Sequence, residues 1–227
     1  GKGTKRMIVD ERIVDYIRSL ETRNSEILEM IEQEALKERV PIIRKEMQSF
    51  LKVFLKMKQP KRILEVGTAV GFSAVFMAQY GEPDAEITTI ENYEKRIPIA
   101  RENFEKSGFA DRITLIPGDA AEVLKTLDGP YDFIFMDAAK GQYIHFLPEV
   151  LRVLDKNGVL ITDNVLQDGD VIESRFAVER RNRTIHKRMR EYLFELTHNE
   201  GLLTSVVPLG DGIAITMKSH EKREETT

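Results

Sequence analysis

Five short apolar runs alternate with amphipathic segments through the middle of the chain, and this alternation constrains the fold more than any other feature. The expected strands are Arg62–Val66, Glu86–Ile90, Arg112–Ile116, Asp132–Met136 and Val159–Thr162. The expected helices between them are Phe72–Tyr80, Tyr93–Ser107, Ala120–Thr126 and Gln142–Leu154. Strands that are connected through helices pair in parallel, and the helices cover both faces of the sheet. The pattern therefore predicts an α/β fold around a mostly parallel sheet.

Segments on both sides extend this core. Apolar residues at helical spacing predict several helices within residues 1–59. After the core we expect a long helix over Glu173–His198, then two strands, Thr204–Val207 and Ile213–Met217, around a glycine-containing turn. No linker or repeat divides the 227 residues. We therefore predict one domain made of N-terminal helices (1–59), an α/β core (60–217) and a charged tail (218–227).

The composition excludes several classes of protein. The chain has no cysteine, which rules out disulfides, thiolate catalysis and cysteine-ligated metals. No apolar stretch approaches the roughly 18 residues of a membrane span, and the first residues lack the apolar core of a signal peptide. The net charge of −4 gives no overall case for nucleic acid, so such a case must come from a local patch. We expect a cytoplasmic protein with no membrane partner.

Two polar fragments, Asp137-Ala-Ala-Lys140 and Asp163-Asn164, each follow a predicted strand. Because neighbouring strands lie roughly 5 Å apart, these side chains should converge at one edge of the sheet. Oxygen ligands of this kind select a hard cation such as Mg²⁺, and a lysine beside them can accept a proton. The alternative for Lys140 is a surface residue at the start of a helix. We favour a reaction centre, because Asp137 lies three positions before the lysine.

A turn with two glycines, Glu65-Val-Gly67-Thr-Ala-Val-Gly71-Phe-Ser73, joins the first strand of the core to its helix. Glycines let the backbone approach a ligand, the helix N-terminus favours an anionic group, and Ser73 supplies a hydroxyl. The spacing is G-x-x-x-G and not the G-x-G-x-x-G of dinucleotide-binding proteins. Tight packing of the helix on the strand explains such glycines equally well.

Two further acidic residues end the second and third strands. Glu91 follows the glycines at the separation where an acid accepts hydrogen bonds from ribose hydroxyls, and Asp119 lies where an adenine would bind. For Glu91 alone a helix cap is an equally good explanation, and for Asp119 alone a cap of the following helix is the better one. All of these signals fall on the edge where open α/β sheets bind ligands. Together they favour an adenosine-containing cofactor.

These motifs, taken in order, resemble those of the cation-dependent O-methyltransferases, which include catechol and caffeoyl-CoA O-methyltransferases. The likeness extends from Pro41 to Met217. It implies a Rossmann-like S-adenosylmethionine-dependent methyltransferase fold, with a seven-stranded, mostly parallel sheet and an antiparallel last strand. It also implies S-adenosylmethionine as cofactor, Mg²⁺ or Mn²⁺ as metal, and a homodimer.

The resemblance also implies a role for individual residues. Asp137, Asp163 and Asn164 would bind the cation, and Lys140, with Asp137 beside it, would be the catalytic base. The cofactor-binding residues would be Gly67 in the turn, Ser73 at the methionine part, Glu91 at the ribose, Asp119 and Ala120 at the adenine, Asp137, and Ile43 through its backbone. A hydroxyl bound to the cation would lose its proton to Lys140 and then attack the methyl group of the cofactor.

The core motifs do not choose the acceptor, but a basic segment near the C-terminus favours one. Seven basic residues and a single acid, Glu179, lie between positions 175 and 190. Helical spacing places Arg180, Arg183, Lys187 and Arg190 on one side of the expected helix, with Arg181 at its boundary. A phosphate backbone is one partner for such a stripe. The alternative is a solvated helix face that forms salt bridges.

Several fragments resemble one bacterial branch, the tRNA 5-hydroxyuridine methyltransferases, which make 5-methoxyuridine at the wobble position of the anticodon. The fragments are Val40-Pro-Ile42, Asp137 to Tyr143, Thr162 to Leu166, Arg180-Arg-Asn-Arg183 and the Gly210-Asp-Gly212 turn. The implied partner is tRNA. Two alternatives remain: a methyltransferase for small catechols or phenols, and a non-catalytic module that binds an adenosine ligand. The second would not need Asp137, Lys140, Asp163 and Asn164 together.

Overall fold

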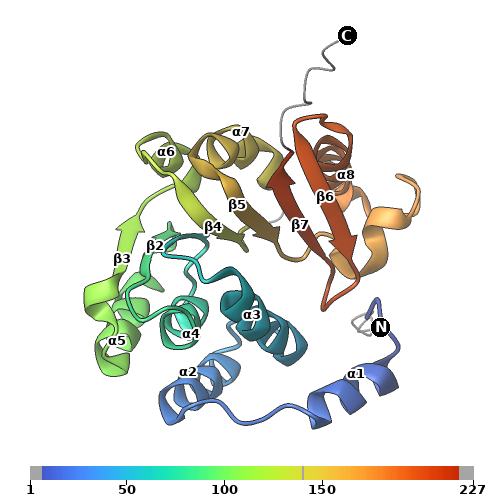
Figure 1. Cartoon of the computed structure of the whole chain (residues 1–227). Coiled ribbons are helices and arrows are strands. Elements are labelled where there is room, and N and C mark those ends of the chain that lie inside the picture. The colour runs from blue at the N-terminus through green and yellow to red at the C-terminus, as the bar shows by residue number, and fades with distance from the viewer. Residues whose placement is uncertain (1–6, 140, 220–227) are drawn as a thin grey trace.

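A single seven-stranded sheet organises the molecule (Figure 1). The computed structural model describes residues 7–139 and 141–219. The strand order is β3-β2-β1-β4-β5-β7-β6. The strands are β1 (Arg62–Val66), β2 (Glu86–Glu91), β3 (Ile113–Pro117), β4 (Tyr131–Met136), β5 (Leu154–Thr162), β6 (Leu202–Val207) and β7 (Ile213–Lys218). All seven predicted strands are therefore present, with differences of at most two residues at their ends except for β5, which begins five residues before the predicted Val159.

The pairing matches the predicted topology. Strands β1 to β5 pair in parallel, whereas β7 is antiparallel to both β5 and β6. The central strands β1 and β4 have apolar side chains on both faces, as expected for parallel strands that helices cover on each side. The prediction of a Rossmann-like sheet with an antiparallel last strand is confirmed.

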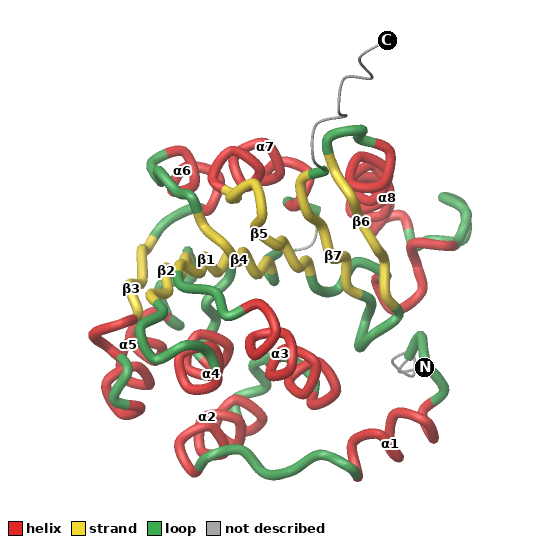
Figure 2. The backbone as a smooth tube through the Cα atoms, viewed as in Figure 1, coloured by secondary structure: helices red, strands yellow, loops and turns green. Residues whose placement is uncertain are grey.

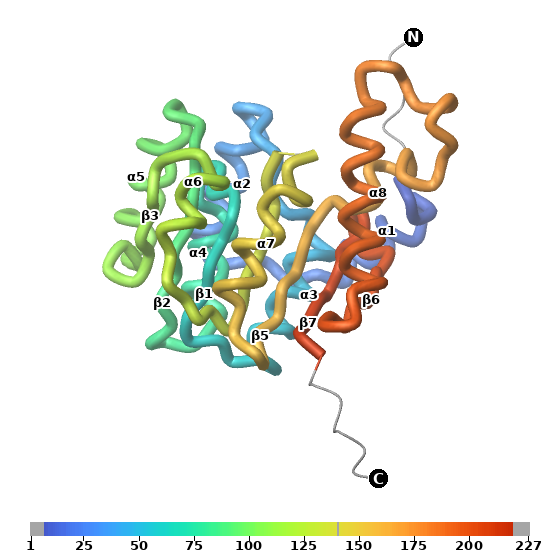
Figure 3. Tube along the Cα trace, turned by 90° about the horizontal axis from the view of Figure 1, so that it is seen from above, coloured from blue at the N-terminus to red at the C-terminus, as the bar shows by residue number. Residues whose placement is uncertain are grey.

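Helices form a layer on each face of the sheet (Figures 1 and 2). One layer contains α2 (Glu26–Lys37), α3 (Lys45–Lys58), α4 (Phe72–Tyr80) and α5 (Ile97–Ser107). The other contains α6 (Ala120–Lys125), α7 (Tyr143–Val153) and α8 (Arg183–His198). Each layer has its own apolar core, the first including Leu51 and Phe76 and the second including Leu147 and Tyr192. Helix α1 (Glu11–Ser19) lies on the same side of the sheet as α2 and α3 and contacts α3, at the end of the molecule where β6 and β7 lie (Figures 1 and 3).

Two helices begin later in the structure than the sequence predicted. Helix α5 begins at Ile97 and not at Tyr93, because the amide of Tyr93 is bound by the Glu91 carboxylate and Pro98 favours a helix start nearby. The long helix predicted from Glu173 begins only at Arg183.

The ten residues before α8 fold back along it. The segment starts after the short 3-10 helix η2 (Gln167–Ile172), in which Asp168 and Gly169 have left-handed backbone conformations. The start of the segment is held against α8 because His186 contacts the carbonyl of Glu173 at 3.0 Å, and Arg190 holds the preceding η2 by donating to the carbonyl of Val171 at 2.7 Å. Arg180 consequently lies on a separate 3-10 turn, η3 (Arg180–Asn182). The single helical stripe that the sequence predicted is therefore wrong at its N-terminal end.

No helix in the described ranges 7–139 and 141–219 combines the length and the hydropathy that a membrane span requires.

Candidate active site

A cavity of about 1180 Å³ opens at the carboxyl ends of the parallel strands. Its wall includes every predicted cofactor and metal residue that the structure describes: Ile43, Gly67, Ser73, Glu91, Asp119, Ala120, Asp137, Asp163 and Asn164. Lys140 lies outside the described residues, so its role remains a prediction. Among the described residues that line the cavity, none comes from the basic segment 175–190. The sheet edge thus brings the two predicted sites together and leaves the acceptor residues apart from them.

The glycine turn is shaped by close packing as well as by access to the cavity. Gly67 has φ +105°, and a side-chain carbon there would overlap the carbonyl oxygen of Asp137. Gly71 begins α4 with φ +90°, and a side-chain carbon there would press on the ring of Phe104. The packing explanation is therefore correct for both glycines. It does not exclude a ligand, because the turn also forms the floor of the cavity.

Glu91 binds the backbone of two loops. Its Oε1 accepts from the amide of Ala69 at 2.7 Å, and its Oε2 accepts from the amides of Asn92 and Tyr93 at 3.1 Å each. A carboxylate has about four acceptor positions, so one remains for a ligand in the cavity. Asp119 likewise caps α6 by accepting from the amide of Ala121 at 3.3 Å. The cap explanation is therefore correct for Asp119 and wrong for Glu91, because the helix after β2 has Arg96 as its N-cap; both acids also line the cavity.

The predicted metal residues lie together where β4 and β5 end. Nδ2 of Asn164 donates to Oδ1 of Asp137 at 3.0 Å, and the backbone amide of Asn164 donates to Oδ1 of Asp163 at 2.8 Å. Asn164 holds this position with a left-handed φ of 59°. Within the described part of the chain, no cluster of three or more His, Cys, Asp or Glu side chains suited to a metal is found. The set offers two carboxylates and one amide.

The two carboxylates of this set, Asp137 and Asp163, lie close enough together to repel each other. Asp163 is 6% exposed, and burial, reinforced by the negative charge of Asp137, raises its pKa to about 7. Arg44 acts in the opposite direction on the pKa of Asp163. A hard cation would relieve this repulsion, and a half-turn of the Asn164 amide would present its oxygen to the same place. The donors therefore fit Mg²⁺ or Mn²⁺ in chemistry.

Tyr143 holds the two strand ends in place, and sequence reasoning did not find it. The residue is the first of α7 and is 1% exposed. Its hydroxyl donates to the carbonyl of Asp163 at 3.1 Å and accepts from the amide of Ala138 at 3.3 Å. It thereby joins the loop after β4 to the loop after β5. A polar-tipped aromatic residue six positions after Asp137 was the only sequence signal.

Glu65 lies in β1 directly before the glycine turn and is completely buried. Its Oε1 accepts from the Thr89 hydroxyl at 2.7 Å, while its Oε2 has no hydrogen-bond partner among the described residues. Burial, with smaller contributions from the charges of Asp137 and Glu91, raises the pKa of Glu65 to about 8. The carboxyl group is therefore mostly protonated at neutral pH, so it adds little negative charge beside the other acids.

The fold is that of an S-adenosylmethionine-dependent methyltransferase. The structure of a methyltransferase from Podospora anserina, solved with bound SAH (S-adenosylhomocysteine), superposes with a TM-score of 0.83 at 27% identity, covering 92% of this chain and 95% of that chain. The family profile described as "O-methyltransferase" matches residues 18–219. The chain belongs to this O-methyltransferase family.

Curated relatives agree with this family. A catechol O-methyltransferase of Mycobacterium tuberculosis is 34% identical over 115 residues, covering 50% of this chain and 52% of that protein. The matched region thus spans about half the length of that relative. The caffeoyl-CoA O-methyltransferase 5 of Nicotiana tabacum is 31% identical over 182 residues, covering 73% of this chain and 72% of that protein.

The raised pKa of Glu65 predicts a pH-dependent stability. Between its unfolded value of 4.5 and its folded value of about 8, the native state holds a proton that the unfolded state releases. The free energy of unfolding must therefore fall as pH rises through this window. Glu65→Gln mimics the protonated group and does not titrate. From pH 5 to pH 8.5 the free energy of unfolding of the variant should therefore rise, relative to that of the wild type, by on the order of a few kcal/mol. Urea denaturation at both pH values measures this difference.

Asp163 also has a raised pKa but is present in both proteins, so the comparison isolates Glu65. Stability curves of the two proteins that run parallel between these pH values would show that Glu65 is ionised in the native state.

Proposed function

We propose that this protein is an S-adenosylmethionine-dependent and divalent-cation-dependent O-methyltransferase. The observation that carries the proposal is the meeting of Asp137, Asp163 and Asn164 in the same cavity as Glu91 and the glycine turn. A non-catalytic module that binds an adenosine ligand would need only Glu91 and the glycine turn. Two acids and an amide beside it are costly to bury without a chemical purpose.

The cofactor would lie along the ends of β1, β2 and β3. Glu91 would accept from its ribose, Asp119 and Ala120 would contact its adenine, and Gly67 and Ser73 would contact its methionine part. When bound, S-adenosylmethionine supplies an electrophilic methyl group on a sulfonium. The work of the protein is to hold the acceptor oxygen in line with that group and to keep water out, which is mainly a matter of positioning.

The cation would be held by Asp137, Asp163 and Asn164, and when bound it makes the acceptor hydroxyl more acidic. Tyr143 and the β4–β5 register fix the ligands before any ion arrives. We propose Lys140 as the group that takes the proton from the acceptor, three positions after Asp137. The acceptor oxygen would then need to approach from the open side of the cavity.

Removal of the metal should abolish activity. We expect turnover to vanish with EDTA and to return with Mg²⁺ or Mn²⁺, because all proposed ligands are hard oxygens. Asp163→Ala should lower turnover by roughly 100-fold or more, with binding of S-adenosylhomocysteine nearly unchanged. Calorimetry measures the binding, and mass spectrometry of the methylated product measures the turnover. The matched control is Asp155→Ala, at the opposite end of β5, which should leave both unchanged. Full activity in a metal-free preparation would contradict cation dependence.

As the acceptor we propose 5-hydroxyuridine at the wobble position of tRNA. Its 5-hydroxyl lies beside a carbonyl, so it offers a cation two oxygens as a catechol does. The basic segment supports this proposal, because Arg175, Arg180, Arg181 and Lys187 are all exposed. Of these, Arg181 pairs with Glu179 at 2.7 Å, and Lys187 lies 3.9 Å from Glu191, both at the surface where such pairs contribute little.

Two members of the predicted stripe have structural contacts of their own. Arg190 donates to Val171 and so helps to hold the preceding loop. Arg183 is half-buried, with its guanidinium 5.9 Å from the ring centre of Phe176. Phe176 itself is 82% exposed. An exposed aromatic ring among arginines is the arrangement on which unpaired bases stack in RNA-binding proteins.

The second candidate acceptor is a small catechol or phenol. The names of the relatives in Mycobacterium tuberculosis and Nicotiana tabacum favour it. The direct test is to incubate the protein with S-adenosylmethionine, Mg²⁺ and either 5-hydroxyuridine-containing tRNA or a catechol, and to analyse the products by mass spectrometry. Methylation of catechol alone would establish the small-molecule function.

The exposed basic residues should distinguish the two acceptors. Arg175→Glu, Arg180→Glu and Lys187→Glu combined should raise the KM for tRNA by about tenfold or more and leave turnover of a small catechol nearly unchanged. Each lost phosphate contact should also reduce the salt dependence of tRNA binding by close to one unit of log–log slope. The control reverses Lys37, Lys56 and Lys125, which are exposed on α2, α3 and α6, and so gives the same net charge outside the segment 175–190. Equal effects of the two triple variants would refute a specific RNA surface.

Phe176 offers a direct reading of RNA contact, because the chain contains no tryptophan. The fluorescence of Phe176→Trp should be quenched by an anticodon stem-loop, since an indole stacks on an unpaired base. Phe194→Trp is the matched control, because Phe194 is 62% exposed on α8 but lies against His198. Equal quenching of both variants would contradict base stacking. A change that follows protein concentration without RNA would instead assign Phe176 to contacts between copies.

We also propose a homodimer, as the resemblance implies. The surface that supports it is the outer face of α1, where Ile13, Tyr16 and Leu20 are each more than half exposed.

A further inference from the structure

The segment Val40–Arg44 forms one wall of the cavity and contains no helix or strand. It connects α2 to α3 across the ends of the strands. Its first residue is fixed because the amide of Val40 donates to the carbonyl of Ala35 at 2.8 Å. Its last residue, Arg44, caps α3 with an extended backbone and without a side-chain cap hydrogen bond. The peptide between Ile43 and Arg44 needs another constraint if the wall is to keep its shape.

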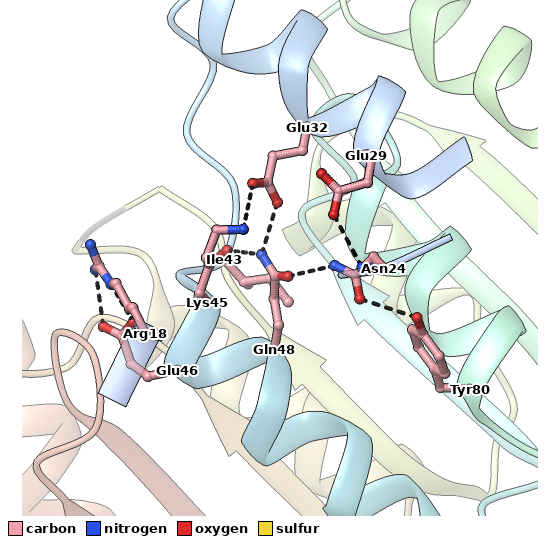
Figure 4. Close-up of polar contacts among 9 residues, drawn as sticks. All are labelled: Arg18, Asn24, Glu29, Glu32, Ile43, Lys45, Glu46, Gln48 and Tyr80. Carbon is pink, nitrogen blue, oxygen red and sulfur yellow. Dashed lines mark hydrogen bonds and ion pairs between the residues drawn. The ribbon is translucent and has the colours of Figure 1, made fainter. Parts of the chain in front are cut away.

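Gln48 supplies that constraint (Figure 4). Its side chain is 5% exposed and reaches back over the first turn of α3, where Nε2 donates to the carbonyl of Ile43 at 2.9 Å. This carbonyl precedes the helix, whose first backbone hydrogen bond runs from the amide of Gln48 to the carbonyl of Arg44. A buried carbonyl without a donor costs about 1–3 kcal/mol. Since a trans peptide is planar, holding this carbonyl also fixes the amide of Arg44.

Neighbouring residues fix the orientation of the Gln48 amide. Its Oε1 accepts from Nδ2 of Asn24 at 2.9 Å. The side-chain oxygen of Asn24, Oδ1, in turn accepts from the Tyr80 hydroxyl at 3.1 Å (Figure 4). Its Nε2 also lies 3.3 Å from Oε2 of Glu32, whose other oxygen pairs with Lys45. The donor side of the amide is thus directed at Ile43. Tyr80 ends α4, the helix that begins at the glycine turn on the cavity floor.

We infer that Gln48 is a positioning residue for the cofactor: it orients the Ile43–Arg44 peptide and so keeps the wall Val40–Arg44 in the shape that binds S-adenosylmethionine. The inference rests on the proposed cofactor but not on the acceptor or the metal. A role in stability alone would lower the melting temperature without changing ligand affinity. A positioning role must change affinity for the cofactor and leave the maximal rate nearly untouched.

The test replaces Gln48 with methionine, which keeps the length of the side chain and removes its donor. Calorimetric titration with S-adenosylhomocysteine should give a Kd about tenfold higher than the wild type, and the KM for S-adenosylmethionine should rise in parallel. The maximal rate at saturating cofactor should change by less than about twofold, because no reacting group has moved. The melting temperature of each preparation is measured alongside.

The matched control is Glu46→Gln. Glu46 lies in the same helix, is 7% exposed and binds Arg18 through both oxygens, and among the described residues its side chain makes no hydrogen bond to the wall segment (Figure 4). It should lower the melting temperature and leave the Kd within about twofold. Gln48→Glu is a second variant that keeps volume and the acceptor for Asn24 but cannot donate to Ile43 when ionised, and it should also weaken binding.

The outcomes separate the two proposals. Lower stability of the Gln48 variants with an unchanged Kd would overturn the positioning role, and so would an equal rise of the Kd in Glu46→Gln. If the wild-type protein itself fails to bind S-adenosylhomocysteine, the proposed cofactor is wrong and the positioning role fails with it.

Discussion

The burial of acidic side chains at the carboxyl edge of the sheet is the constraint on which the rest of the site depends. Glu65, Glu91 and Asp163 are each less than 9% exposed, and Asp137 lies beside them. Buried charges cost several kcal/mol each unless they are paired or hydrogen-bonded. The surroundings of these acids differ. Glu91 is bound by three backbone amides, Asp163 by one amide, and Glu65 retains a proton. Local donors thus decide which acid carries charge.

The sheet register places these acids with little freedom. Val66 pairs with Met136, and Met136 pairs with Thr162, so the residues that follow each of them leave the sheet at the same height. Asp137 and Asp163 are the next residues on their strands. A slip of one residue would turn Asp163 to the opposite face of the sheet. Apolar burial on both faces of β4 and β5 prevents such a slip, so core packing and site geometry have the same cause.

Much of the fold could be predicted because it follows from local periodicity. The bounds of β1 and α4 were predicted to the residue, since each is a mainly apolar segment with glycine or proline residues close to both ends. The helix before residue 183 was predicted wrongly for the opposite reason. Its basic residues have helical spacing, but the contacts of Arg190 and His186 with residues 171 and 173 hold the chain outside the helix. Such contacts leave no periodic signal in the sequence.

The same division applies to the site. Residues at strand ends could be predicted, because the edge of a parallel sheet is a general place for ligands. Tyr143 and Gln48 could not, since each acts through a backbone carbonyl that only the folded chain brings near. The roles of Glu91 and Asp119 could not be decided from the sequence either, because a carboxylate has enough acceptor positions to bind backbone amides and a ligand at the same time.

Acceptor choice is a separate physical problem from methyl transfer. The proposed chemistry requires only a cation site and a cofactor site at one sheet edge, and any hydroxyl beside a second oxygen would suit it. Selection must therefore come from the surface around the opening. The buried side of α8, with Met189, Tyr192 and Leu196, fixes that helix on the sheet and leaves its other side exposed. The loop tied to it by Arg190 presents Phe176 and Arg175 in a fixed place. We therefore propose that acceptor recognition lies in the part of the chain whose structure local sequence patterns predicted least well.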